Sequence, residues 1–245
     1  MASKAVATKQ DHAIQPSENA DEFSDFVGGG MENVSANDIL IPRLSILQDL
    51  SPQVKKQKAE YIEGAETGMI VDVGTGELFP DGIIFLPLYY RKDYLEWAPR
   101  DSGKGLVKIH SGPEILDQTS PDSKGRPCLP SGNYIAETAQ FFGFNVTADF
   151  RQSFIPMAST QLKKARKWLT LATGEKLTRP DGSSFTPPLW YRCYALGSVH
   201  ESNAQGDWHG WKIERSVSLP EIAQIAPVDW KDLKERAVKF AEQIK

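Results

Sequence analysis

Residues 82–97, with the sequence GIIFLPLYYRKDYLEW, are the stretch that decides the fold. Aliphatic and aromatic residues dominate it, which is typical of a β-strand. Pro87 and the charged residues 91–93 interrupt the apolar pattern, and the stretch is longer than most strands. We therefore expect a bent strand of a small barrel and not a flat strand.

The rest of the chain alternates apolar segments with turn-forming residues. Residues 100–132 consist mostly of Gly, Ser, Pro, Asp and Lys, and we interpret them as a mobile loop, because connections of that length are uncommon. We predict a mainly β fold with added helices (β+α), an OB-like antiparallel barrel with this long insertion loop and a C-terminal helix. The segments behind this prediction are a hairpin at 69–79, an aromatic β segment at 133–155, a hairpin with arms at 189–199 and 208–217, and helices at 43–50, 161–171 and 230–244.

The acidity of the chain is concentrated near its N-terminus. The net charge is −4 at pH 7. Residues 1–36 contain two Lys and six Asp or Glu and so carry this whole charge, which leaves residues 37–245 neutral. Because residues 1–36 also contain few bulky apolar side chains, of which Phe23 and Phe26 form the one apolar island, we predict a disordered acidic tail. We predict that residues 37–245 form a single OB-like nucleic-acid-binding domain. The neutral net charge of these residues does not argue against nucleic-acid binding, since local charge matters more for such binding than the total.

Composition excludes several classes of protein. No apolar run approaches the roughly 18–20 residues that cross a bilayer, and the lysines near the N-terminus precede no apolar signal segment. Cys128 and Cys193 lie far apart without CxxC spacing, so neither a disulfide framework nor a zinc site is indicated. We expect no membrane partner and a location in the cytoplasm.

Catalytic motifs are absent from the sequence. It contains no GxxxxGK[ST], GxGxxG, GxSxG or HExxH motif. His200 and His209 face each other across a predicted hairpin but lack a third ligand at suitable spacing. Asp-x-Lys occurs only in the long loop and the terminal helix, so a metal-dependent nuclease is disfavoured. We expect a protein that is not an enzyme and needs no metal or cofactor.

Aromatic and basic residues are interleaved on the strand at 82–97. Alternation places Tyr90, Lys92 and Tyr94 on one face and Arg91 on the other, with Trp97 joining the first face only if a bulge near Leu95 resets the pattern. Rings stack on bases and cations neutralise phosphates, which is the chemistry of single-stranded nucleic-acid binding. The alternative is that the rings are barrel core and the charges its solvated rim. Our candidate binding residues here are Tyr90, Arg91, Lys92, Tyr94 and Trp97.

Two further segments supply candidates. The helix at 161–171 carries four cations within five residues, of which three share one face, with no acidic residue inside the helix. A phosphate-contacting surface and a merely solvated helix both fit this pattern. The hairpin at 189–217 is rich in tryptophan, and some of these side chains must be core. The candidate binding residues are Lys163, Lys164, Arg166 and Lys167 on the helix, and Trp190, Arg192 and Trp211 on the hairpin.

Several segments of the chain match the sequence pattern of a known group of proteins: 41–53 (IPRLSILQDLSPQ), 61–65, 68–77, 87–97 (PLYYRKDYLEW), 157–168, 186–188, 208–211 and the terminal helix. In these segments the chain resembles a group of bacteriophage proteins taken to be single-stranded DNA-binding proteins of OB-fold type. The resemblance implies non-enzymatic, largely sequence-independent binding of single-stranded DNA in phage DNA replication or recombination, in the cytoplasm of the infected bacterial host. The resemblance does not cover the acidic N-terminal tail, which we expect either to compete with DNA or to recruit replication or recombination proteins. A homo-oligomer is one assembly that we consider.

An alternative function belongs to a different class. A phage structural protein, or a module that binds a host protein without binding nucleic acid, also fits the neutral body and the long loop at 100–132. Tryptophan fluorescence during titration with oligo(dT) separates the two, because base stacking quenches indole emission and a protein-binding module shows no change.

Overall fold

The computed structural model describes residues 41–204, 206–218, 220–221, 232, 235–236 and 239–240. The predicted acidic tail, residues 1–36, lies outside the described residues, as does most of the predicted terminal helix. Among the described residues, no helix is long and apolar enough to cross a membrane.

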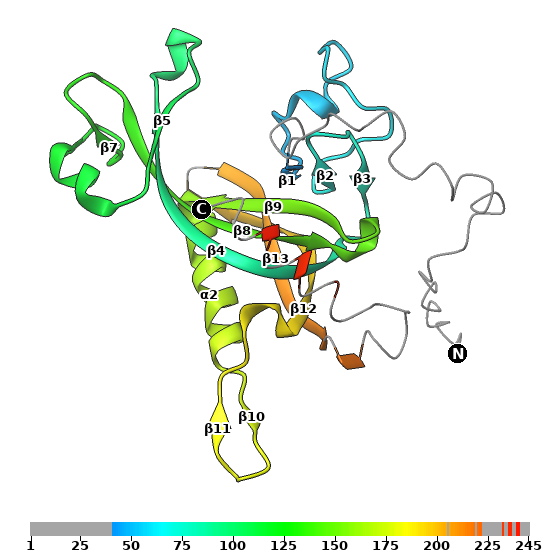
Figure 1. Ribbon diagram of the computed structural model, residues 1–245. Coiled ribbons are helices and arrows are strands. Elements are labelled where there is room, and N and C mark those ends of the chain that lie inside the picture. The colour runs from blue at the N-terminus through cyan, green and yellow to red at the C-terminus, as the bar shows by residue number, and fades with distance from the viewer. Residues whose placement is uncertain are drawn as a thin grey trace, which may run out of the picture.

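The described chain is mainly β, as the sequence predicts, and its one α-helix with described bounds corresponds to the helix predicted at 161–171 (Figure 1). The helix is α2 (Leu162–Thr173), and short 3-10 turns include η5 (Pro113–Gln118), η7 (Ser159–Gln161) and η8 (Leu189–Tyr191). The strands are β1 (Leu44–Ile46), β2 (Ile70–Asp72), β3 (Leu78–Phe79), β4 (Ile83–Trp97), β5 (Leu106–His110), β6 (Ser120–Pro121), β7 (Pro127–Cys128), β8 (Tyr134–Asn145), β9 (Arg151–Ala158), β10 (Leu177–Thr178), β11 (Ser184–Phe185), β12 (Arg192–Asn203) and β13 (Gly206–Ser218).

Two sequence predictions need correction. Residues 43–50 were expected to be helical, but they contain strand β1, because Leu44 and Ile46 alternate into the core and pair with β2. Residues 100–132 are not one structureless loop: β5 pairs with β4, β7 pairs with β8, and η5 lies between them. The hairpins expected at 69–79 and 189–217 are confirmed as β2–β3 and β12–β13.

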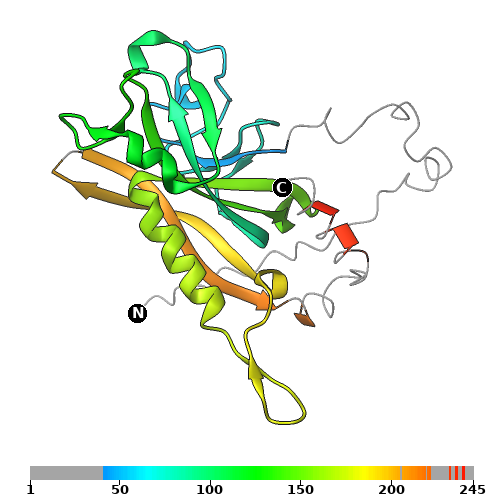
Figure 2. The ribbon, with the colours of Figure 1, turned by 60° about the vertical axis from the view of Figure 1, so that its left-hand side comes forward.

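The long strand β4 organises the main sheet. β8 pairs with it along nearly its whole length, whereas its other edge pairs first with β12 and then with β5. Five strands in the order β13-β12-β4-β8-β9 form a curled antiparallel sheet, and the far halves of β4 and β8 continue with β5, β7 and β6 as a projecting arm (Figures 1 and 2).

A β-bulge in β4 sets which side chains face the inside of the curl. The register with β8 shifts between Pro87 and Tyr89, so that Leu88 is an extra residue. A bulge bends a strand and increases its twist, which fits the bent strand predicted from the sequence. Opposite it stands Gly143, where any side chain would collide with the Leu86 carbonyl oxygen and the Phe85 ring.

Helix α2 fills the inside of the curled sheet. Ala165 and Trp168 are buried there, and the Trp168 ring stacks on Phe141 at 4.1 Å between centroids. Phe85 and Tyr194 meet the same indole edge-to-face. These contacts join one helix to three strands, so the helix and sheet form a single core.

The outer face of the sheet has its own cluster. It includes Phe142, Phe144 and Cys193, together with Phe240 from the C-terminal segment. Phe240 is fully buried and stacks on Phe144. Phe240 is the one residue of the predicted terminal stripe that is described, and it has helical conformation, as expected.

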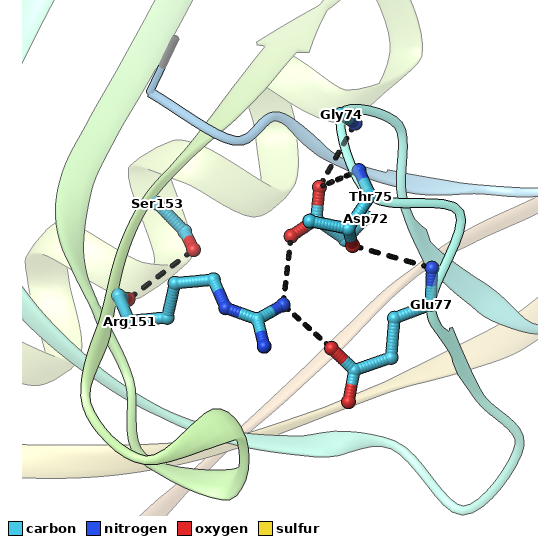
Figure 3. A network of polar contacts seen from close by, with 6 residues as sticks. All are labelled: Asp72, Gly74, Thr75, Glu77, Arg151 and Ser153. Carbon is cyan, nitrogen blue, oxygen red and sulfur yellow. Dashed lines mark hydrogen bonds and ion pairs between the residues drawn. The ribbon is translucent and has the colours of Figure 1, made fainter. Parts of the chain in front are cut away.

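The small sheet β1-β2-β3 is fastened to the main sheet by polar contacts. The side chain of Gln48 makes two hydrogen bonds of 2.9 Å with the backbone of His209 on β13. Figure 3 shows a second link, in which Arg151 contacts Glu77 at 2.6 Å and the buried Asp72 at 3.4 Å. Asp72 also accepts hydrogen bonds from the backbone of Gly74 and Thr75. The β2–β3 turn is therefore held against the start of β9.

We predict that Arg151→Met destabilises the fold. It leaves the Asp72 carboxylate, only 1% exposed, without its cation, so the free energy of unfolding should fall by about 1–3 kcal/mol in urea denaturation. Glu77→Gln is the control: it removes the exposed partner and should cost less than about 1 kcal/mol. Equal losses in the two variants would contradict the burial argument.

Candidate nucleic-acid interface

The outward face of α2 is held in place by contacts at the start of the helix. The side-chain oxygen of Gln161 accepts a hydrogen bond of 2.9 Å from the backbone N–H of Trp211. Lys164 forms an ion pair of 2.6 Å with Glu201 on β12, and the Trp208 indole N–H donates to the same carboxylate. The hydrogen bond from Lys164 lowers the pKa of Glu201. Lys164 therefore links the start of α2 to the β12–β13 hairpin.

Three other cations of α2 are exposed. Lys163, Arg166 and Lys167 lie on the side of the helix opposite Ala165 and Trp168, because residues at i, i+3 and i+4 share one face. Within the described part of the chain, none of the three makes an ion pair with an acidic side chain. We call these three residues the cationic face.

Tyr90 and Lys92 of β4 lie on the same side of the sheet as α2. The Tyr90 ring is half-buried and packs on Phe141 at 5.2 Å. Burial raises the pKa of the Tyr90 phenol, and the positive charges of Lys92 and then Arg166 act in the opposite direction. Lys92 is exposed but pairs with Glu137 at 3.0 Å, which raises the pKa of its ammonium group. The structure thus brings two strand candidates close to the cationic face.

Comparison with known protein families identifies a relationship over almost the whole chain. The model of the family described as Pam3 phage gp34-like protein matches residues 9–245. The chain belongs to this family. No curated protein and no solved structure matches the chain. The expectation of a phage protein is confirmed by this family.

In this phage family member, Arg91 and Trp97 lie on the opposite face of β4. Arg91 contacts the buried Asp93 at 2.7 Å and lies over the Phe142 ring. Trp97 lies directly opposite Tyr134, the first residue of the neighbouring strand β8. A register shift does occur near Trp97, but the extra residue is Val107 on β5, so the alternation along β4 is unchanged. A bulge in β4 would have moved Trp97 to the face of Tyr90, but the bulge is in β5. Trp97 therefore stays on the opposite face of β4.

Four more candidates are placed in structural roles. Tyr94 is only 6% exposed and packs with Ile115 and Ile135, and Trp211 is 4% exposed in the core around α2. Neither ring is presented to a ligand, because Tyr94 is covered in the cluster that includes Ile115 of η5, and Trp211 lies in the core around α2. Trp190 packs against the outer cluster. Arg192 binds Glu175 through Nε and Nη2 and donates from Nη1 to the Ser216 carbonyl, so its guanidinium is occupied within the fold.

Among the ring–cation pairs of the structure, two in turn-rich segments were not predicted from the sequence. Arg179 lies over the Phe185 ring at 4.4 Å in the β10–β11 hairpin, and Arg126 lies over Tyr134 at 5.0 Å beside β7. Both lie in turn-rich segments with short strands of two residues. The only available signal was an arginine followed six to eight residues later by an aromatic residue across a Pro- and Gly-containing turn.

No metal centre is formed by the described residues, which contain no group of three or more His, Cys, Asp or Glu side chains able to hold an ion. His200 and His209 are directly opposite each other in β12 and β13, as the sequence predicts, with ring centroids 5.5 Å apart. The Cys193 thiol is buried, and burial raises its pKa to about 12, so it is a core side chain and a poor nucleophile.

We predict that Tyr94→Ala acts on folding and not on ligand binding. Removing a buried ring should lower the free energy of unfolding by about 3–5 kcal/mol. Tyr90→Ala, at a half-buried ring, should cost less. Urea denaturation of both variants measures the difference. A Tyr94 variant as stable as the wild type would show that this ring is not core.

We predict that the Glu201–Lys164 pair makes stability depend on pH. A carboxylate whose pKa is lower in the folded state stabilises the fold above its unfolded pKa, near 4.5, and loses this contribution as pH falls through the folded pKa. Unfolding measured from neutral pH to below pH 4 should therefore show a smaller pH dependence for Glu201→Gln than for wild type. Glu214→Gln, at an exposed carboxylate paired with Lys212, is the matched control and should follow the wild type.

Proposed function

We propose that this protein binds single-stranded DNA with little sequence preference, as a non-enzymatic component of phage DNA replication or recombination. The observation that carries the proposal is the cationic face, three exposed cations on one rigid helix with no acidic partner among the described side chains. A strand of nucleic acid has a phosphate at every nucleotide, so closely spaced and unneutralised cations match its chemistry.

The surroundings of the cationic face support the same proposal. Tyr90 adds a partly exposed ring on the same side of the sheet, and Lys92 adds an exposed cation that is paired with Glu137. Aromatic side chains beside a cationic groove give binding that tolerates any sequence, because every base has a face to stack. Among our twelve candidate residues, the supported set is Tyr90, Lys92, Lys163, Arg166 and Lys167.

The strand order supports an OB-like barrel as the scaffold. An OB-fold is a five-stranded, partly open barrel that binds oligonucleotides. Here five strands curl in the order β13-β12-β4-β8-β9, and α2 follows β9 and precedes β12. Numbered along the chain, the order of these paired strands is fifth, fourth, first, second, third. The segment β1 to Gln48 lies between β9 and β13, where the curl is open.

A second candidate function is binding to another protein. The observation in its favour is strand β5, whose Leu106, Val107 and Ile109 are 44–51% exposed on one edge of the arm. Exposed apolar edge strands are frequent sites of strand addition. In this alternative the chain is a structural or host-interaction module, and the cations of α2 are solvated.

Other parts of the proposal follow from DNA binding. The acidic residues 1–36 would compete with DNA for the cationic face or recruit replication or recombination proteins. The place of action would be the cytoplasm of the infected bacterium, and the protein would act alone or as a homo-oligomer.

We predict that replacing Lys163, Arg166 and Lys167 together by Gln weakens binding of oligo(dT). Glutamine keeps helix propensity while removing three cations that would meet phosphates. The slope of log affinity against log salt should shrink by about 2, at roughly 0.7 for each phosphate no longer neutralised, in fluorescence anisotropy titrations at several salt concentrations.

The matched control is replacement of Lys55, Lys56 and Lys58 by Gln. It removes the same number of charges from the segment between β1 and β2. If both variants lose affinity equally, only total charge matters. Wild-type protein that leaves oligo(dT) unbound at low salt, with no change in tryptophan fluorescence, would favour the protein-binding alternative.

A further inference from the structure

The hairpin at residues 174–188, which we call the finger, projects from the end of α2 away from the sheet (Figures 1 and 2). Its strands β10 and β11 pair only with each other. None of its residues belongs to the three core clusters of the described chain. An isolated two-stranded hairpin is at best marginally stable in water, so core packing does not explain why this one extends into solvent.

The base of the finger is fixed relative to α2. Glu175 forms a two-pronged ion pair with Arg192 of β12, and Arg192 also donates to the Ser216 carbonyl of β13. Arg215 of β13 donates to the carbonyl of Leu171 in the last turn of α2. Arg192, one of our candidate binding residues, therefore orients the finger through its contacts with Glu175 and Ser216.

The tip of the finger is a preorganised turn. The Arg179 backbone N–H donates to Ser183, the Gly182 N–H donates back to Arg179, and the Asp181 carboxylate accepts from the Ser183 N–H. Gly182 has φ of +82°, a conformation that favours glycine. The Arg179 guanidinium also donates to the Ser183 hydroxyl at 3.1 Å. Arg179 is therefore held in one position over the half-buried Phe185 ring.

The finger continues the charge of the helix. Residues 162–188 contain six Lys or Arg and two Asp or Glu, a local charge of +4 in a chain whose net charge is −4. One of the two acids, Glu175, is already neutralised by Arg192. Beyond the cationic face, the finger adds Lys176, Arg179 and an aromatic ring. The combination of cation and ring is the same chemistry that single-stranded DNA requires.

We infer that the finger is a second contact site for single-stranded DNA, where a base stacks on the Arg179–Phe185 pair after the backbone has crossed the cationic face. The inference rests on the proposed function and extends it, because it places one end of the DNA path and so sets the length of strand that one molecule covers. The ring–cation pair of Arg126 and Tyr134 has no part in this path. Tyr134 pairs with Trp97 on the face of β4 that points away from α2.

The test is anisotropy titration of the full chain with oligo(dT) of increasing length, comparing wild type with the double variant Arg179→Ala, Phe185→Ala. Oligonucleotides too short to reach the finger should bind both proteins alike. Longer ones should bind the variant about 5- to 140-fold more weakly, the effect of removing one stacked base. Arg179→Lys keeps the charge but loses the planar stacking group, so it should retain only part of the affinity.

The matched control is Arg126→Ala, Tyr134→Ala, which removes the same chemistry elsewhere and should leave the length dependence unchanged. Thermal unfolding confirms that each variant is folded. The inference is overturned if the finger variant binds all lengths like wild type, or if both double variants lose affinity equally. It is also overturned if polyglutamate binds the finger as tightly as oligo(dT), since the occupant is then an acidic protein segment. Only wild-type protein that binds no oligo(dT) refutes the proposed function itself.

Discussion

The packing of Trp168 inside the curled sheet is the interaction on which the rest of the structure depends. Its ring contacts side chains from β4, β8 and β12, so it joins the three central strands of the curl to one helix. Its indole N–H has no hydrogen-bond partner within the described part of the protein, so shape and apolar contact hold this position. Because α2 has 3.6 residues per turn, burying Ala165 and Trp168 forces Lys163, Arg166 and Lys167 outward. The core contact and the cationic face are two sides of one helix.

The cations that stabilise the fold form ion pairs with carboxylates, whereas those of the cationic face form no such pair among the described residues and remain available to a ligand. Arg151 holds the β2–β3 turn, Lys164 fastens the start of α2, and Arg192 orients the finger. Each is close to a carboxylate and is partly shielded from solvent. The cationic face differs in both respects, which makes it the part of α2 best suited to a mobile polyanion. The fold therefore uses some of its positive charge internally, whereas three of the remaining cations share one exposed face of α2.

The two candidate functions belong to different surfaces of this phage family member. Charge and a half-exposed ring are found on the side of α2, whereas apolar exposure is concentrated on β5 at the edge of the arm. A single-stranded DNA-binding protein that also meets partner proteins would use both. The separation matters because substitutions on the helix and on the arm test the two functions independently.

Local pattern was enough to predict part of this structure. The composition of residues 82–97 indicated a bent strand, the arms of the β12–β13 hairpin were visible as alternating apolar runs, and the charge of α2 followed from four cations in five residues. These features depend on neighbours in the sequence, which is why they could be predicted. The helix predicted at 43–50 is wrong, because β1 forms there instead and its pairing with β2 overrides a weak local preference for helix.

Tertiary structure alone decided which candidates face a ligand. Tyr90 and Tyr94 lie on the same face of β4 by alternation, yet one is half-exposed and the other is buried, because η5 lies over the arm and not over the centre of the sheet. Lys164 and Arg166 are equivalent in the sequence, and only the distant Glu201 distinguishes them. Alternation along a strand or helix determines the direction of a side chain, whereas burial and neutralisation depend on segments far away in the chain that fold against it.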